Sequence, residues 1–107
     1  MTQLIVTFCT CPDKDTAEKI ARLLLEDKLT ACVNILPNIT SLYSWKDKIE
    51  VAEECLLIIK SPQSGYADME TVILNHHPYE LPEIIAVPVT QGSPEYINWI
   101  LSCHATN

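Results

Sequence analysis

Apolar positions recur with two different periods along the chain, and these periods predict an alternation of strands and helices. Residues 4–9 form a short, mostly apolar run, which is typical of a central strand. After a break at residues 10–13, apolar residues recur at i, i+3, i+4, i+7 and i+8, which predicts an amphipathic helix ending near Lys28. Asp15 has a glutamate three residues later, as a helix-capping residue often does. The predicted buried stripe of this helix consists of Ala17, Ile20, Ala21, Leu24 and Leu25.

Two long strand-like runs follow, residues 31–45 and residues 49–60, with a short polar turn between them. Pro37 lies inside the first run, and a proline within a strand requires a sheet edge or a bulge. The second half of the second run is apolar on both faces, as in a strand at the centre of a sheet. Asp47 is expected in the turn because Asp tolerates the left-handed conformation. The pattern predicts a β-hairpin with one edge strand and one central strand.

The predicted hairpin is too long to lie within the rest of the domain. Its first strand has 15 residues and would span ~50 Å at ~3.3 Å per residue. A domain of this size has a radius of gyration of only ~13 Å. The tip is therefore expected to project and to expose Tyr43, Trp45 and Ile49. Exposed apolar patches usually mark interfaces, so we expect a homo-oligomer joined partly through the edge strands.

The remaining elements complete an α+β fold. Residues 64–75 have helical periodicity, residues 83–89 form a fourth strand, and a final helix begins at Ser93-Pro94. The predicted core residues of these two helices are Tyr66, Met69, Ile73, Tyr96, Ile97, Ile100 and Leu101. The order β-α-β-β-α-β plus a terminal helix is the ferredoxin-like arrangement. Right-handed crossovers then place the first and third strands at the centre of the sheet, antiparallel, in a single domain of residues 1–107.

Charge and composition exclude several classes of partner. The chain has 107 residues and a formal net charge of −7, which argues against nucleic acid or an anionic membrane as a partner. No apolar run approaches the ~20 residues of a membrane span, and the N-terminus lacks the flanks of a signal peptide. The five cysteines are an odd number without CxxC spacing. Reduced thiols and a cytoplasmic location are therefore expected.

The densest chemistry lies in residues 75–83, which combine two imidazoles, two carboxylates, one phenol and two prolines. The prolines predict a stiff, non-helical corner, and polar groups on loops beside core elements often form sites. In the predicted topology the first strand ends at the sheet edge where this corner lies. Cys9 and Cys11 are therefore expected near His76, His77, Glu80 and Glu83.

Several segments, taken together and in order, form a specific pattern. They are Ala31-Cys32-Val33-Asn34, Ser41-Leu42-Tyr43-Ser44-Trp45, Glu53-Glu54, Leu57-Ile58-Ile59-Lys60, His77-Pro78-Tyr79-Glu80, Pro82-Glu83-Ile84, and Tyr96 with Trp99. On these segments the chain resembles the CutA family of divalent-ion tolerance proteins over essentially its full length. The resemblance implies a ferredoxin-like fold, a compact homotrimer with hairpins packed across subunits, and a role in tolerance to divalent metals, with copper the ion most often associated with bacterial members.

The resemblance also implies a ligand set. Cys9, His76 and His77 would bind copper, one ion per subunit. Cys11 is not a position to which the resemblance extends. Asp47 stands where the family often has Gly at the hairpin tip, a departure that affects only the turn geometry.

Copper chemistry fits these residue types, although two structural interpretations compete with it. Thiolate suits soft ions such as Cu(I) and Zn(II), and imidazole suits copper and zinc. Adjacent residues on a helix point ~100° apart, so His76 and His77 converge on one ion only if the helix ends between them, as Pro78 favours. Otherwise both imidazoles complement a helix C-terminus, and Cys9 is a small buried apolar residue. Cys11 shares the strand face of Cys9 and is a candidate second thiol ligand.

The other polar candidates have structural interpretations. Three cysteines are expected to pack in the interior, namely Cys32, Cys55 and Cys103. Two carboxylates are expected to be solvated or paired with a basic residue of another subunit, namely Glu53 and Glu54. Three corner residues either stabilise the corner or line a pocket between subunits, namely Tyr79, Glu80 and Glu83. His104 is interpreted as a bystander.

Three classes of function follow. We favour a non-enzymatic homotrimer that binds copper or other divalent ions and contributes to metal tolerance. The alternative is a small-molecule sensor trimer similar to PII-type regulators, but fold analogy is weak evidence and the only glycines, Gly65 and Gly92, make no phosphate-binding loop. An enzyme is disfavoured because Cys9 ends a strand with no evident base or helix N-terminus to activate its thiol.

Overall fold

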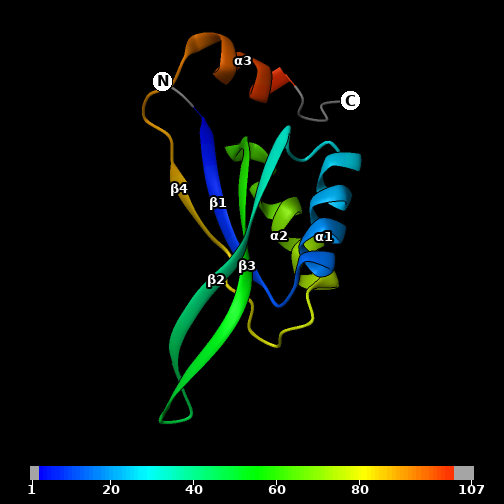
Figure 1. Cartoon of the computed structure of the whole chain (residues 1–107). Helices are drawn as coiled ribbons and strands as arrows, with labels where there is room; N and C mark the ends of the chain where they lie inside the picture. Colours follow the sequence, from blue (N-terminus) through cyan, green and yellow to red (C-terminus); the bar gives the residue numbers. More distant parts are fainter. Residues whose placement is uncertain (1–2, 103–107) are drawn as a thin grey trace.

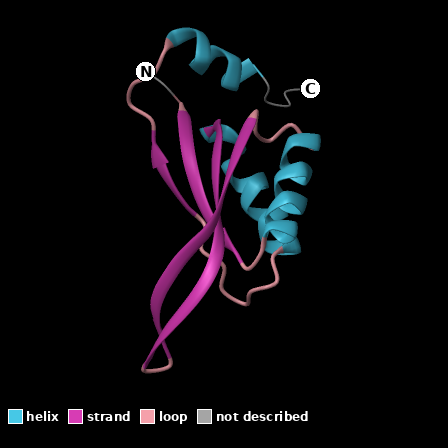
Figure 2. Cartoon of the chain, viewed as in Figure 1, coloured by secondary structure: helices cyan, strands magenta, loops and turns pink. Residues whose placement is uncertain are grey.

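The computed structural model describes residues 3–102 and contains one four-stranded antiparallel sheet (Figure 1). In chain order the elements are β1 (Leu4–Cys11), α1 (Lys14–Glu26), β2 (Cys32–Trp45), β3 (Lys48–Pro62), the 3-10 helix η1 (Gln63–Gly65), α2 (Tyr66–His76), β4 (Ile85–Pro88) and α3 (Pro94–Ser102). Helices α1 and α2 lie on one side of the sheet, and α3 lies across the end where β1 begins (Figure 2). Within the described residues, no helix is long and apolar enough to cross a membrane.

The strand order is β2-β3-β1-β4, so β1 and β3 occupy the centre and run antiparallel. This confirms the predicted α+β, ferredoxin-like arrangement with its long β2–β3 hairpin and C-terminal helix. The topology also brings the end of β1 beside the corner that follows α2. The contact between the ring of His77 and the backbone of Thr10 shows this.

The main core lies between the sheet and the helices α1 and α2. One face of β1 points into it and contributes the buried residues Ile5, Thr7, Cys9 and Cys11. The helices contribute Ala17, Ile20, Ala21, Leu24, Met69 and Ile73, as their periodicity predicts. A second, smaller cluster joins Leu4 to Ile97 and Ile100 of α3.

Three local predictions about the helices are wrong. Asp13, and not Asp15, caps α1, because its extended backbone lets Oδ1 accept a hydrogen bond from the Thr16 N–H at 2.8 Å. Asp15 already lies in the first turn of the helix. Leu25 and Tyr96 are each 42% exposed, because they lie at the flank of the apolar stripe of their helix.

The β2–β3 hairpin projects well beyond the helices, as predicted (Figure 1). The chain measures 44 × 26 × 21 Å along its principal axes, and the hairpin accounts for this elongation. A register shift between Leu36 and Ile39 confirms the irregularity expected at Pro37, with Asn38 at a φ of 61°. At the tip, Lys46 and Asp47 have φ angles of 51° and 65°, which confirms a left-handed turn at Asp47.

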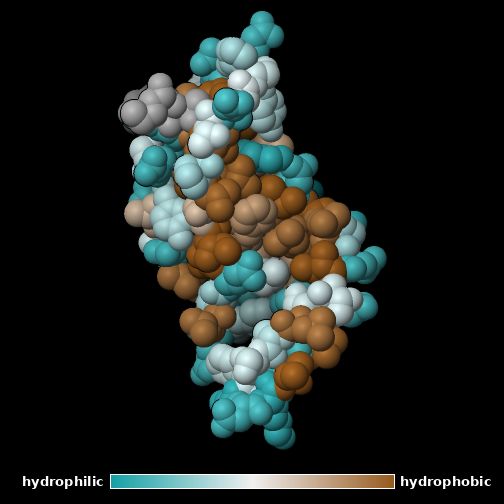
Figure 3. All heavy atoms as spheres, turned by 90° about the vertical axis from the view of Figure 1, so that its left-hand side faces the viewer, coloured by the Kyte–Doolittle hydropathy of each residue, from teal (hydrophilic) through white to brown (hydrophobic). Residues whose placement is uncertain are grey.

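The sheet face opposite α1 and α2, here called the open face, is covered by a helix only near the start of β1, where α3 packs on Leu4. In the strand register, Phe8 pairs with Ile58 on one side and with Ile85 on the other, and Val6 pairs with Val87. These residues alternate with the core-facing residues of β1, so they lie on the open face. Apolar side chains gather over the middle of this side of the molecule (Figure 3), and Ile85 is 57% exposed.

Candidate metal centre

Cys9 and Cys11 lie at the C-terminal end of β1, two residues apart in an extended strand. Alternate residues of a strand face the same side, and both thiols point into the core, where their residues are 0% exposed. Pro12 follows directly and ends the strand before Asp13 caps α1. The end of a central strand therefore holds two sulfur atoms side by side in the interior.

His77 joins these thiols from the corner after α2. The helix ends at His76, and His77 turns to an extended backbone with ψ of 136°, as suits a residue before proline. Its ring reaches the backbone of β1, where Nε2 lies 2.7 Å from the Thr10 carbonyl oxygen. His77 is only 8% exposed.

His76 takes the opposite direction. It is exposed, and its Nδ1 lies 3.0 Å from the carbonyl oxygen of Val72, one helical turn back. The helix thus ends between the two imidazoles, as Pro78 predicts, but the change of backbone separates the rings. Of the predicted set Cys9, His76 and His77, the structure brings together Cys9 and His77 and leaves His76 outside.

The residues that do meet are Cys9, Cys11 and His77, here called the thiol–imidazole cluster. One ligand atom from each lies within 4.8 Å of the other two, and all three residues are buried. Neutral imidazole and thiolate are metal ligands, so the cluster has the chemistry and the compactness to hold an ion.

The pKa values of the two thiols shift in opposite directions. The hydrogen bond between them, reinforced by burial, raises the pKa of Cys9 far above its usual value. The same hydrogen bond from Cys9 lowers the pKa of Cys11. Of the two thiols, Cys11 therefore gives up its proton more readily than Cys9.

Hydrogen bonds fix the tautomer of His77. The backbone N–H of Tyr79 donates to Nδ1 at 3.1 Å, so Nδ1 is unprotonated. A carbonyl can only accept, so Nε2 carries the hydrogen that is donated to Thr10. Both ring nitrogens are engaged, and binding an ion through this ring requires one of the two hydrogen bonds to be given up.

A tyrosine and a glutamate flank the cluster. The Tyr79 hydroxyl donates to Glu54 Oε2 at 2.7 Å, and the ring of Tyr79 lies 4.8 Å from that of His77 between centroids. Burial, followed by this hydrogen bond to a carboxylate, raises the pKa of Tyr79. Glu54 is 7% exposed and bound to Tyr79, so the expectation that it is solvated is wrong, whereas pairing with a basic residue of another subunit stays a prediction.

The other candidate residues are not members of the cluster. Glu53, Glu80 and Glu83 are exposed. Cys55 is buried in the main core as predicted, and Cys32 is half-buried with Lys60 Nζ 3.8 Å from its sulfur. The remaining predictions concern Cys103 and His104, which lie outside the described residues.

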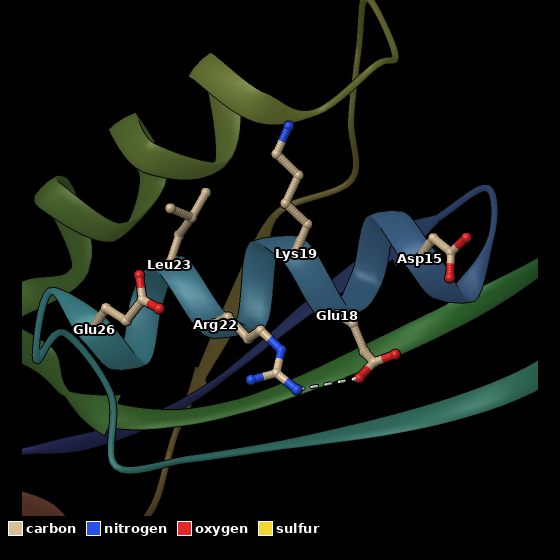
Figure 4. A pocket seen from close by; sticks show the side chains of 6 residues that line it. All are labelled: Asp15, Glu18, Lys19, Arg22, Leu23 and Glu26. Carbon is tan, nitrogen blue, oxygen red and sulfur yellow. Dashed lines mark ion pairs between the residues drawn. The ribbon is translucent and has the colours of Figure 1, made fainter.

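A hollow on the outer face of α1 is not a candidate site (Figure 4). It is lined by Asp15, Glu18, Lys19, Arg22, Leu23 and Glu26, all from one helix. The side chains of Arg22 and Glu18 form an ion pair at 3.8 Å and are 73% and 44% exposed. Such a pair is a feature of a solvated helix face.

Fold and site together define a class: a ferredoxin-like subunit with a projecting hairpin and a buried cluster of two thiols and one imidazole. The family model of the CutA1 divalent ion tolerance protein matches residues 5–103. The chain therefore belongs to the CutA1 divalent ion tolerance protein family.

Curated relatives agree with this assignment. Protein CutA of Mus musculus is 46% identical over 93 residues, which are 87% of this chain and 52% of the mouse protein. The divalent-cation tolerance protein CutA of Escherichia coli O81 is 39% identical over 99 residues, which are 92% of this chain and 88% of that protein. The chain thus spans about half the length of the mouse relative and most of the bacterial one.

Solved structures show the same fold. CutA from Xylella fastidiosa is 41% identical and superposes with a TM-score of 0.94 over 97% of this chain and 100% of that chain. The periplasmic divalent cation tolerance protein CutA from Archaeoglobus fulgidus is 39% identical, with a TM-score of 0.88 over 91% of this chain and 94% of that chain.

Proposed function

We propose that this chain binds copper at a site built on Cys9 and His77 and contributes to divalent-metal tolerance as a non-enzymatic homotrimer. The observation that supports copper binding most directly is the buried juxtaposition of this thiol and this imidazole, carried by segments far apart in the sequence. Membership of a divalent ion tolerance family supports the physiological role.

The chemistry of the donors supports copper over harder ions. Sulfur and imidazole nitrogen suit copper and zinc, whereas magnesium and calcium need oxygen ligands. The carboxylate of Glu54 is already bound to Tyr79. When bound, the ion would be sequestered away from solvent, because Cys9 is 0% exposed and His77 is 8% exposed.

The proposal is tested by titrating the reduced protein with Cu(I) and with Cu(II), measured by calorimetry. We expect one copper per subunit, and at least a ~10-fold weaker affinity for Cys9→Ala and for His77→Ala, because even outer partners of metal ligands contribute ~10–100-fold. His76→Ala is the matched control: it removes the neighbouring but exposed imidazole and should bind copper as the wild type does. Equal affinity in all four proteins would rule out this site.

Two apolar surfaces support the homotrimer. The open face carries Ile85 and Val87, 57% and 44% exposed, and the projecting hairpin carries Ile49 and Val51, 78% and 64% exposed. An exposed apolar area of this kind on a small subunit marks an interface. Light scattering coupled to size exclusion should give a mass of about three times 12.0 kDa. A mass of one subunit at micromolar concentration would contradict the trimer.

We also propose a cytoplasmic location. Cys9, Cys11, Cys32 and Cys55 are free thiols, and free thiols persist in reducing compartments. Cell fractionation with thiol trapping should recover the protein reduced and in the cytoplasmic fraction. Recovery from an oxidising compartment would overturn this location without affecting the fold.

A further inference from the structure

We propose that Cys11 is a second copper ligand and that the Cys9–Cys11 pair makes the site selective for monovalent copper, Cu(I), over Zn(II) and other divalent ions. This inference rests on the proposed function, because it concerns the same site. The resemblance to the family does not extend to Cys11, so the second thiol and the selectivity that it confers are inferred from this chain alone.

The strand that carries Cys9 also places Cys11. Both residues lie on the core-facing side of β1 and are 0% exposed. Their sulfur atoms and one nitrogen of His77 lie within 4.8 Å of one another. An ion that binds sulfur at ~2.3 Å holds two sulfurs no more than ~4.6 Å apart. The three donors are therefore separated by nearly the distance that a single ion would impose, and only a small adjustment is required.

The donor set determines which ions fit. Two sulfurs and one imidazole form a soft set, which selects Cu(I) and Zn(II) and disfavours ions that prefer oxygen. A site with a single sulfur ligand would discriminate less strongly between soft ions and ions that prefer oxygen. Cys11 thus changes the class of ion that the site prefers, in addition to its affinity.

The number of donors then separates Cu(I) from zinc. Structural zinc is almost always bound by four ligands in a tetrahedron. Among residues 3–102, no fourth Cys, His, Asp or Glu joins the three donors within the same distance. Burial of Cys9, Cys11 and His77 also leaves little room for water as a fourth ligand. Cu(I) is a soft ion that accepts two or three ligands, so it matches this set better than Zn(II).

The two thiols are the leading ligands within the cluster. Both nitrogens of His77 already make hydrogen bonds, to Thr10 and from Tyr79. Coordination through this ring costs one of those bonds, whereas the hydrogen bond that the Cys9 thiol donates to the Thr10 carbonyl oxygen is a weak one at 3.8 Å. Removing Cys11 should therefore weaken Cu(I) binding at least as much as removing His77.

The experiment is an anaerobic competition between the reduced protein and a chromophoric Cu(I) chelator, combined with X-ray absorption at the copper edge. The wild type should show two sulfur neighbours per copper, and excess Zn(II) should not displace the ion. Cys11→Ala should show one sulfur neighbour and a Cu(I) affinity more than ~100-fold lower, since loss of a direct ligand exceeds the ~10–100-fold effect of outer partners. Cys11→Ser, which keeps nearly the same volume, should give the same loss.

Cys55→Ala is the matched control. Cys55 pairs with Cys11 across β1 and β3, belongs to the same core and is 5% exposed, but it is not part of the thiol–imidazole cluster. Its removal should leave the sulfur count and the Cu(I) affinity unchanged.

Three results would overturn the inference: one sulfur neighbour in the wild type, unchanged Cu(I) affinity in the Cys11 variants, or displacement of Cu(I) by Zn(II). If Cys9→Ala loses copper while Cys11→Ala keeps it, the proposed function stands and only the role of Cys11 fails. If the wild type binds no copper at all, both fail. The sulfur count in the wild type needs no variant, so the test holds even if the Cys11 variants fold poorly.

Discussion

The two halves of β3 contrast within a single strand. From Glu54 to Pro62 alternate residues are buried beneath α1 and α2, whereas from Lys48 to Glu53 every residue is exposed or half-buried. Both halves carry large apolar side chains: Ile59 is 0% exposed and Ile49 is 78% exposed. Hydrophobicity alone therefore does not bury a residue; a covering element does. The covered half is stabilised within the subunit, whereas the projecting half leaves large apolar side chains exposed.

The largest effect should come from deleting apolar volume in the covered half. Ile59→Ala is expected to lower the free energy of unfolding by about 2–5 kcal/mol, because it removes buried surface and leaves a cavity in a closely packed core. Ile59 lies opposite Thr7 in the centre of the sheet, where neighbouring strands limit relaxation. Chemical denaturation followed by circular dichroism measures the loss.

Ile49→Ala is the matched substitution in the projecting half. Within one subunit the change should be neutral to about 0.5 kcal/mol, as for most surface positions. In the proposed trimer its cost should grow with protein concentration, since assembly is coupled to folding by mass action. The contrast between the halves breaks down if Ile49→Ala costs as much as Ile59→Ala at every concentration.

The fold could be predicted because its signals are local and repeated. The spacing of Ala17, Ile20, Ala21 and Leu24 defines the buried stripe of α1, and the element order defines the sheet. The cap was missed because Asp13 and Asp15 both lie in range, and only the extended backbone of Asp13 decides between them. Leu25 shows the same limit, since periodicity does not give the width of the covered stripe.

The site could be predicted only in part. Topology places Cys9 near His77, and the structure confirms that they meet. The directions of the two imidazoles depend on one backbone angle, the extended ψ of His77 after the helix end, and the residue order does not determine where each ring goes. The burial of Glu54 was missed for a similar reason, because its partner Tyr79 comes from a distant segment.

An intermediate effect is expected at the boundary between the two halves of β3, where Tyr79 holds Glu54. Tyr79→Phe leaves a carboxylate that is 7% exposed without its donor, which should cost about 1–3 kcal/mol. The phenol is stabilised in its protonated form, so this contribution is fully present below its ordinary pKa of 10.0 and is lost as the pH rises through the higher value of the folded state. Denaturation at neutral and at alkaline pH measures both.

Tyr66→Phe serves as the control for this boundary contact. Its hydroxyl also donates to a carboxylate, Glu70 Oε2 at 3.0 Å, but Glu70 is only half-buried and can turn to water. The loss should therefore be smaller than for Tyr79→Phe. Equal losses would mean that burial of Glu54 contributes nothing, and that the boundary is not held by this hydrogen bond.

The smallest effect should come from removing the N-terminal cap of α1, one of the two helices that cover the sheet. Asp13→Ala removes the capping acceptor for the Thr16 N–H and should lower the melting temperature by a few degrees at pH 7. The hydrogen bonds from Thr16 lower the pKa of Asp13 below its ordinary 3.8. The stabilisation is therefore fully present above pH 3.8 and is lost as the pH falls through the lower pKa of the folded state, so the difference between Asp13→Ala and the wild type should vanish in acid.

Asp13→Asn, which also caps the helix, should be as stable as the wild type at pH 7 and more stable than the wild type as the pH falls. A larger loss from Asp15→Ala than from Asp13→Ala would instead place the cap at Asp15.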